Sequence, residues 1–61
     1  MNETIRVPAE EIEHLRMVAT AAQAILTGRA DNVWGILTAA YPDATSDQKL
    51  RASLAAMKAT R

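Results

Sequence analysis

Side chains capable of acid–base or nucleophilic chemistry are few in this sequence, and they form no catalytic pattern. The chain holds one imidazole, at His14, which follows carboxylates at Glu10, Glu11 and Glu13, and it contains no cysteine. A catalytic imidazole requires a nucleophile and an orienting carboxylate, and no spacing here supplies both. One imidazole without thiolates is also too few ligands for structural zinc. We therefore predict a protein that is not an enzyme and has no cofactor, metal or small-molecule substrate.

These residues are better understood as parts of secondary-structure elements. The three glutamates are typical of the first turn of a helix, where the helix dipole stabilises negative charge. Before them, Thr4, Ile5, Arg6 and Val7 alternate polar and apolar side chains and include β-branched residues. This alternation predicts a short strand near the N-terminus, and an unpaired arm is the alternative. Pro8 would end the strand and suits the first turn of a helix.

A long helix is predicted over residues 8–27. Its apolar residues recur with a 3-4-3-4 spacing and are flanked by Val18 and Ile25, so the apolar face is wide enough to contact more than one neighbour. The residues of this stripe are Ile12, Leu15, Ala19, Ala22 and Leu26. Gly28 follows directly and is well placed to end the helix in a left-handed conformation.

Two shorter helices are predicted over residues 31–41 and 45–60. Asp31 or Asn32 can cap the first of them, and Pro42 ends it. Gly35 inside this helix favours close backbone packing. The second helix opens with a capping-box pattern, Thr-Ser-Asp-Gln at 45–48. Its apolar stripe is narrow and interleaved with basic residues, so we predict that residues 43–61 pack loosely and bind a partner.

Length and charge limit the classes of function. The 61 residues make at most one small domain, 1–61, with seven basic and seven acidic side chains and a net charge of zero. A chain this short buries little surface and has no disulfide to stabilise it, so we predict a homodimer. The apolar stretch near Ala19–Leu26 is too short to span a membrane, and the N-terminus does not look like a secretory signal. These features predict a soluble cytoplasmic protein.

The order strand, proline, helix, Gly-Arg turn, helix resembles the ribbon-helix-helix family of DNA-binding repressors. The resemblance covers about residues 2–41. It rests on the segment Arg-Val-Pro-Ala-Glu-Glu-Ile-Glu-His-Leu-Arg-Met-Val-Ala at 6–19 and on Gly-Arg-Ala-Asp-Asn at 28–32. It implies a mainly α-helical homodimer whose N-terminal strands pair as an antiparallel ribbon, and it implies transcriptional repression through sequence-specific binding to a DNA operator.

The resemblance also implies roles for individual residues. Asn2, Thr4 and Arg6 would point outward from the ribbon into the DNA major groove, where Arg can bind guanine and Asn can bind adenine bidentately. Arg29 and Asn32, at the turn before the second helix, would lie near a DNA phosphate. The predicted dimer core consists of Ile5, Val7, Ile12, Leu15, Trp34 and Leu37.

Alternative interpretations remain open on the sequence. If the N-terminal arm is unpaired, the first two helices form an all-α hairpin that dimerises as a four-helix bundle. Zero net charge is unusual for a DNA-binding protein. It favours a phage- or mobile-element-encoded inhibitor that blocks a host regulatory protein through a helical surface. An antitoxin with a toxin-binding C-terminal helix is a third hypothesis. The expected partner surface consists of Met17, Leu50, Leu54 and Met57.

Overall fold

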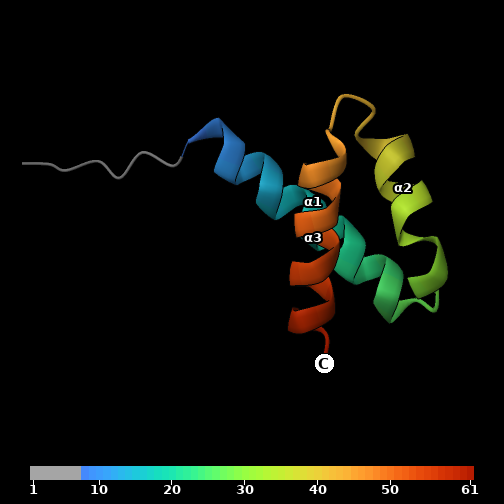
Figure 1. Ribbon diagram of the computed structural model, residues 1–61. Helices are drawn as coiled ribbons and strands as arrows, with labels where there is room; N and C mark the ends of the chain where they lie inside the picture. Colours follow the sequence, from blue (N-terminus) through green and yellow to red (C-terminus); the bar gives the residue numbers. More distant parts are fainter. Residues whose placement is uncertain (1–7) are drawn as a thin grey trace, which may run out of the picture.

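The computed structural model describes residues 8–61, and these residues form three α-helices and one short 3₁₀ turn (Figure 1). Helix α1 spans Ala9–Leu26, α2 spans Val33–Ala40 and α3 spans Ser46–Ala59. The 3₁₀ turn η1, Ala30–Asn32, leads directly into α2. The predicted helices 8–27, 31–41 and 45–60 are thus confirmed to within two residues at each end.

Helix α1 ends at a backbone turn that depends on Gly28. This residue has a φ of 83°, in the left-handed region that favours glycine. The Arg29 N–H donates to the carbonyl of Ala24 at 2.8 Å, and the Gly28 N–H donates to that of Ile25 at 3.2 Å. This is the Schellman pattern, which satisfies carbonyls left unpaired at a helix end. The predicted role of Gly28 is therefore confirmed.

Helix α3 begins at a reciprocal capping box, as the sequence predicted. The Gln48 N–H donates to the Thr45 hydroxyl at 3.1 Å, and the Thr45 N–H donates to the Gln48 side-chain carbonyl at 2.8 Å. Between α2 and α3 the chain passes through Tyr41, whose hydroxyl lies 2.9 Å from that of Thr20 in α1. This hydrogen bond ties the α2–α3 connection to the long helix.

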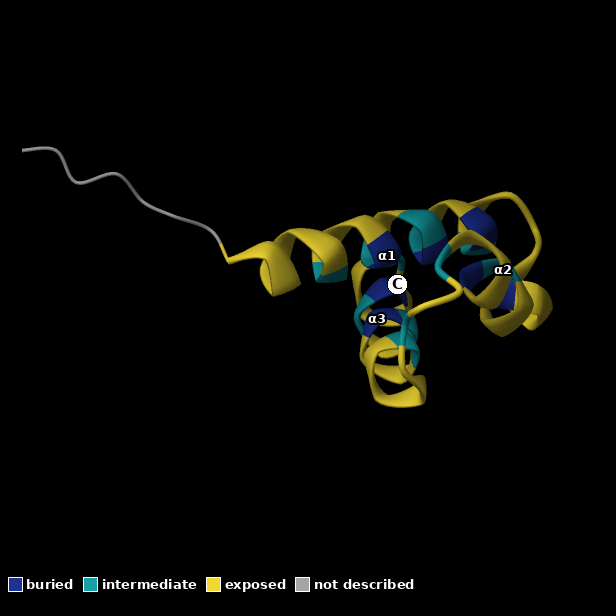
Figure 2. Ribbon diagram, turned by 90° about the horizontal axis from the view of Figure 1, so that it is seen from above, coloured by how far each residue is buried: buried dark blue, intermediate teal, exposed yellow. Residues whose placement is uncertain are grey.

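The core of the protein is built mainly from small side chains. Helices α2 and α3 both lie on the same side of α1, and the buried residues face one another across that space (Figure 2). The seven buried residues are Met17, Ala21, Ala24, Val33, Leu37, Ala52 and Ala56. Alanines on both α1 and α3 allow the two helices to approach closely. Leu37 of α2 is the one large side chain that is fully buried among the described residues.

This architecture corrects the ribbon-helix-helix prediction. Residues 8–61 contain no strand, and their core is formed within one chain by three helices. Leu37, predicted in the dimer core, is buried inside this single chain. The alternative of a two-helix hairpin is also wrong, because α3 contributes Ala52 and Ala56 to the core. The predicted strand, from the alternation at Thr4–Val7, lies outside the described residues.

The face by which α1 packs is a second correction. The sequence favoured the stripe that includes Ile12, Leu15 and Leu26, but all three side chains are exposed. Helix α1 instead buries Met17, Ala21 and Ala24, which are spaced 4-3 on the opposite side. The reason is steric: the alanine face brings α1 against the alanines of α3, whereas the leucine face would hold the helices apart. No helix in residues 8–61 is long and apolar enough to cross a membrane.

Candidate protein-binding surfaces

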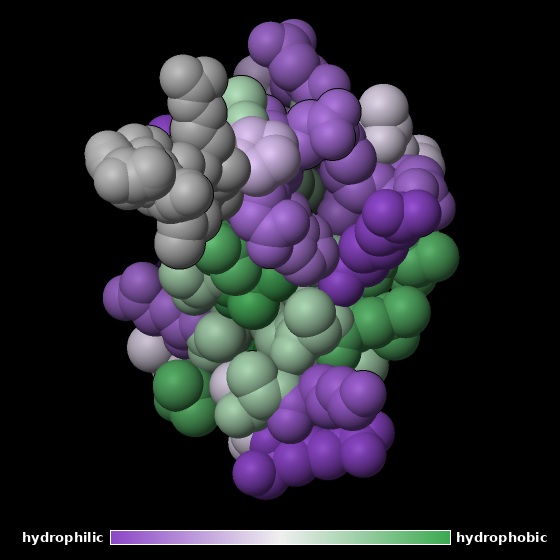
Figure 3. All heavy atoms as spheres, turned by 90° about the vertical axis from the view of Figure 1, so that its left-hand side faces the viewer, coloured by the Kyte–Doolittle hydropathy of each residue, from purple (hydrophilic) through white to green (hydrophobic). Residues whose placement is uncertain are grey.

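More large apolar side chains are exposed than buried in the described chain. The core holds only Met17, Val33 and Leu37 besides alanines. The exposed large hydrophobic residues are Ile12, Leu15, Leu26, Trp34, Leu50, Leu54 and Met57. Figure 3 shows hydrophobic atoms gathered across the middle of the face toward which α1 projects, between hydrophilic regions above and below. Scattered exposed leucines are ordinary, but a contiguous apolar area on a small protein is typical of an interaction site.

The first candidate binding surface is the α3 stripe, which we define as Leu50, Leu54 and Met57. Their 4-3 spacing places them on one face of α3. The buried residues of the same helix, Ala52 and Ala56, lie on the other side. The α3 stripe is therefore not needed to pack α3 into the fold. Three of the four residues predicted for the partner surface are exposed here, whereas Met17, the fourth, is only 2% exposed and belongs to the core.

Basic side chains border the α3 stripe. Arg51, Lys58 and Arg61 are exposed. Arg51 also makes a 3.2 Å ion pair with Asp47, but both side chains are more than 70% exposed, so solvent screens this pair strongly. The stripe is thus apolar at its centre, and its border carries a net positive charge, because Asp47 offsets Arg51 while Lys58 and Arg61 make no ion pair among the described residues. This arrangement can dock into an apolar groove on a protein with an acidic rim.

The second candidate surface lies on α1 and is called the α1 seam. We define it as Ile12, Leu15, Ala19, Ala22 and Leu26, of which Ala22 is half-buried and the others are exposed. Leu26 is 73% exposed, the largest value among the exposed large hydrophobic residues. Ile12, Leu15, Ala19 and Leu26 lie on the side of α1 away from Met17, Ala21 and Ala24, whereas Ala22 is partly packed against the core. Ile12 and Leu15, predicted in a dimer core, are therefore available to a partner.

Trp34, also predicted in the dimer core, lies at the surface of α2 and is 44% exposed. The Lys49 ammonium lies 4.9 Å from the centre of its ring and also donates to the Thr38 hydroxyl at 3.0 Å. Such a cation–π contact contributes about 0.5–1 kcal/mol at an exposed site. Trp34 thus helps to fix α2 on α3. No local pattern in the sequence predicts this role of Lys49, although the capping box places Lys49 close to the start of α3.

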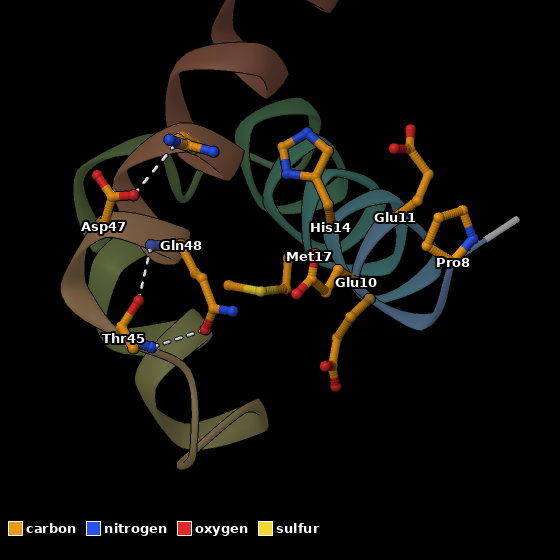
Figure 4. Close-up of a pocket in the computed structure, with 10 residues that line it drawn as sticks. Pro8, Glu10, Glu11, His14, Met17, Thr45, Asp47 and Gln48 are labelled. Carbon is orange, nitrogen blue, oxygen red and sulfur yellow. Dashed lines mark hydrogen bonds and ion pairs between the residues drawn. The ribbon is translucent and has the colours of Figure 1, made fainter.

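A groove lies between the first half of α1 and the start of α3, and Figure 4 shows the residues that line it. Its volume is about 550 Å³, and its lining includes Glu10, His14, Met17, Asp47 and Gln48. The Gln48 side chain is held in the capping box, and that of Asp47 in the ion pair with Arg51. No group of three or more histidine or acidic side chains in residues 8–61 is arranged to hold a metal ion. The walls of the groove carry both acidic and basic side chains.

The predicted DNA-binding residues divide into two groups. Asn2, Thr4 and Arg6, like the predicted core residues Ile5 and Val7, lie outside the described residues. The surfaces described above are therefore defined without these five residues.

Arg29 and Asn32 are exposed at the turn between α1 and α2. The Asn32 side chain makes no capping hydrogen bond to α2 and lies over Gly35. A Cβ at Gly35 would meet the Asn32 Oδ1 at 2.7 Å, and its three nearest atoms all belong to the Asn32 side chain. The expected close backbone packing at Gly35 is therefore wrong, because this glycine makes room for a neighbouring side chain. Asp31, the other expected cap, is part of η1.

No protein-family model, curated protein or solved structure matches this chain.

Proposed function

We propose that this protein is a non-enzymatic binding module that acts by docking the α3 stripe into an apolar groove on a regulatory protein. The observation that carries the proposal is the division of α3 into two apolar faces. Its alanine face packs in the core, and Leu50, Leu54 and Met57 on the other side remain exposed. An amphipathic helix presenting anchors at such spacing is a recurring mode of helix-in-groove recognition.

The charges around the stripe indicate the kind of partner. Arg51, Lys58 and Arg61 supply positive charge near the apolar anchors. Complementary charge at the rim of an interface chiefly raises the rate of association and the specificity. We therefore expect a groove lined with apolar side chains and bordered by Asp and Glu. Occupation of that groove would exclude its usual helical ligand, so the module would act as an inhibitor.

The experiment uses a photo-crosslinking amino acid at Leu54 in the full chain, followed by titration of the purified crosslinked protein. We expect Leu54→Asp to weaken its binding at least about a hundredfold, because a central apolar anchor becomes a desolvated charge. Ala39→Asp is the control, since it introduces the same charge at an exposed position of α2 that belongs to neither the α3 stripe nor the α1 seam. Equal loss of binding in both variants, or no loss with Leu54→Asp, would contradict the proposal.

The DNA-binding hypothesis drawn from the sequence predicts a different result in a parallel assay. If the N-terminal segment reads DNA, selection of genomic fragments will enrich one sequence, and Arg6→Ala will abolish its binding. That binding would also weaken steeply with salt, because phosphate contacts release counterions. Enrichment of a sequence that depends on Arg6 and not on Leu54 would replace the protein-binding proposal.

A further inference from the structure

We propose that two copies of this chain pair in parallel through the α1 seam. The inference is independent of the proposed function, because the seam and the α3 stripe lie on different helices. It assigns the exposed face of α1 to a second copy of the same chain. The dimer would carry two copies of the α3 stripe.

The spacing of the seam is that of a coiled-coil interface. Ile12, Ala19 and Leu26 occupy equivalent positions seven residues apart, and Leu15 and Ala22 occupy the intermediate positions. In heptad terms the first set is at a and the second at d. A β-branched residue at a with Leu at d, as in Ile12 and Leu15, favours a parallel two-stranded arrangement. Ala19, at the next a position, is small and exposed and allows the paired helices to approach closely there. Ala22, at the next d position, is half-buried against the core of its own chain, so it contributes less to the pairing.

The charges beside the seam select the parallel orientation. Glu11 and Arg16 occupy the flanking g and e positions, five residues apart. In a parallel pair each g residue faces the e residue five positions later in the other helix, so Glu11 of each copy meets Arg16 of the other. Such pairs set the orientation of coiled coils. In an antiparallel pair g faces g and e faces e, and neither residue would find an opposite charge among these flanking positions.

Both charged side chains are available for this contact. Glu11 and Arg16 are exposed, and the one ion pair within residues 8–61 joins Asp47 and Arg51 instead. Being five residues apart, Glu11 and Arg16 do not face each other on their own helix, where neighbours are three or four apart. Glu11 and Arg16 can therefore pair between two helices but not within one helix.

The fold leaves space for the second copy. Helices α2 and α3 pack against one side of α1, and the other side carries no element of residues 8–61 (Figure 2). The first half of α1 projects beyond α3, as Figures 1 and 2 both show, and it carries Ile12 and Leu15. Pairing along α1 would cover these side chains, and it would supplement a core in which Leu37 is the one fully buried large side chain among the described residues.

The first test is sedimentation equilibrium of the full chain at micromolar concentration. We expect wild type to sediment as a dimer and Leu15→Ala to weaken association at least about a hundredfold, because each dimer loses two buried leucine side chains. Leu54→Asp is the control and should leave the dimer unchanged, which separates this inference from the proposed function. A wild-type monomer at these concentrations, or a dimer that Leu15→Ala leaves unchanged, would overturn the pairing.

The second test uses charge-exchange and cysteine variants, and it remains informative if Leu15→Ala fails to fold. Glu11→Lys and Arg16→Glu should each weaken the dimer, whereas the double variant should restore it, because the exchanged charges would again face opposite charges in the other copy. Leu15→Cys should form an intermolecular disulfide on oxidation, since a parallel pair places the two copies of residue 15 side by side. Failure of the double variant to restore association, or absence of the crosslink, would refute the parallel orientation.

Discussion

The contrast between two leucines gives the sharpest test of the fold. Leu37 has no exposed surface, whereas Leu54 is 54% exposed on α3. Leu37→Ala removes a fully buried side chain and leaves a cavity, which costs about 2–5 kcal/mol of the free energy of unfolding. A chain of 61 residues has a total of about 3–9 kcal/mol at typical values per residue. Leu37→Ala should therefore remove a large share of the free energy of unfolding, and it would unfold the protein if the total lies at the low end of this range.

Leu54→Ala makes the same chemical change with a much smaller expected cost. About half of the side chain is already in water, no enclosed cavity forms, and Ala is the better helix former, so the loss should be below about 1 kcal/mol. Urea denaturation followed by far-ultraviolet circular dichroism measures both variants at one chain concentration, which must be fixed if the protein associates. Equal destabilisation by the two substitutions would mean that the α3 stripe is buried in the folded chain and would refute the assignment of faces.

Other substitutions test the local features of the fold by the same measurement. Thr45→Ala should cost about 1 kcal/mol by removing the side-chain half of the capping box, and Thr45→Ser should restore most of it. Gly28→Ala should cost about 1–2 kcal/mol, and the cause would be its φ of 83° alone, because a Cβ there meets no atom within 4 Å. Ala52→Leu should cost about 1–3 kcal/mol by overpacking a fully buried site, and no loss would mean that α1 and α3 are not in close contact there.

The ends of the helices could be predicted from the sequence because their signals are local. Gly28 supplies a backbone conformation that other residues adopt at a cost, Pro42 stops α2, and the capping box starts α3. Each of these effects involves a few neighbouring residues and does not depend on the rest of the chain. The three helices therefore fall within two residues of their predicted bounds.

The packing face of α1 could not be predicted in this way, because the helix carries two apolar stripes. Hydropathy favours the one with Ile12, Leu15 and Leu26 over the one with Met17, Ala21 and Ala24. The choice between them depends on α3, whose buried residues are alanines that a hydropathy pattern ranks low. Two helices approach closely only when both have an alanine face at the contact. The packing face of α1 can therefore be predicted only when α1 and α3 are considered together.

The faces by which α1 and α3 pack also decide which of their apolar residues remain exposed as candidate binding surfaces. Leu50, Leu54 and Met57 were expected at a partner surface because their stripe is narrow, and the structure leaves them exposed. Met17 was expected there as an apolar residue off the main stripe of α1, but it is buried, since that stripe is the outer face. The DNA-reading residues expected at positions 2–6 lie outside the described residues, whereas Arg29 and Asn32 are exposed at the turn between α1 and α2.

If the chain associates as proposed, its alanine-rich interior would couple folding to binding. Because α1 and α3 pack through small residues, the fold leaves the larger side chains of both helices outside, where their apolar surface is removed from water only by association. A ligand or second copy that binds the folded chain raises its stability in proportion to the logarithm of the ligand concentration. Leu15→Ala should therefore lower the unfolding midpoint at high chain concentration and leave it nearly unchanged at high dilution. Leu37→Ala should lower it at both, since Leu37 stabilises the single chain itself.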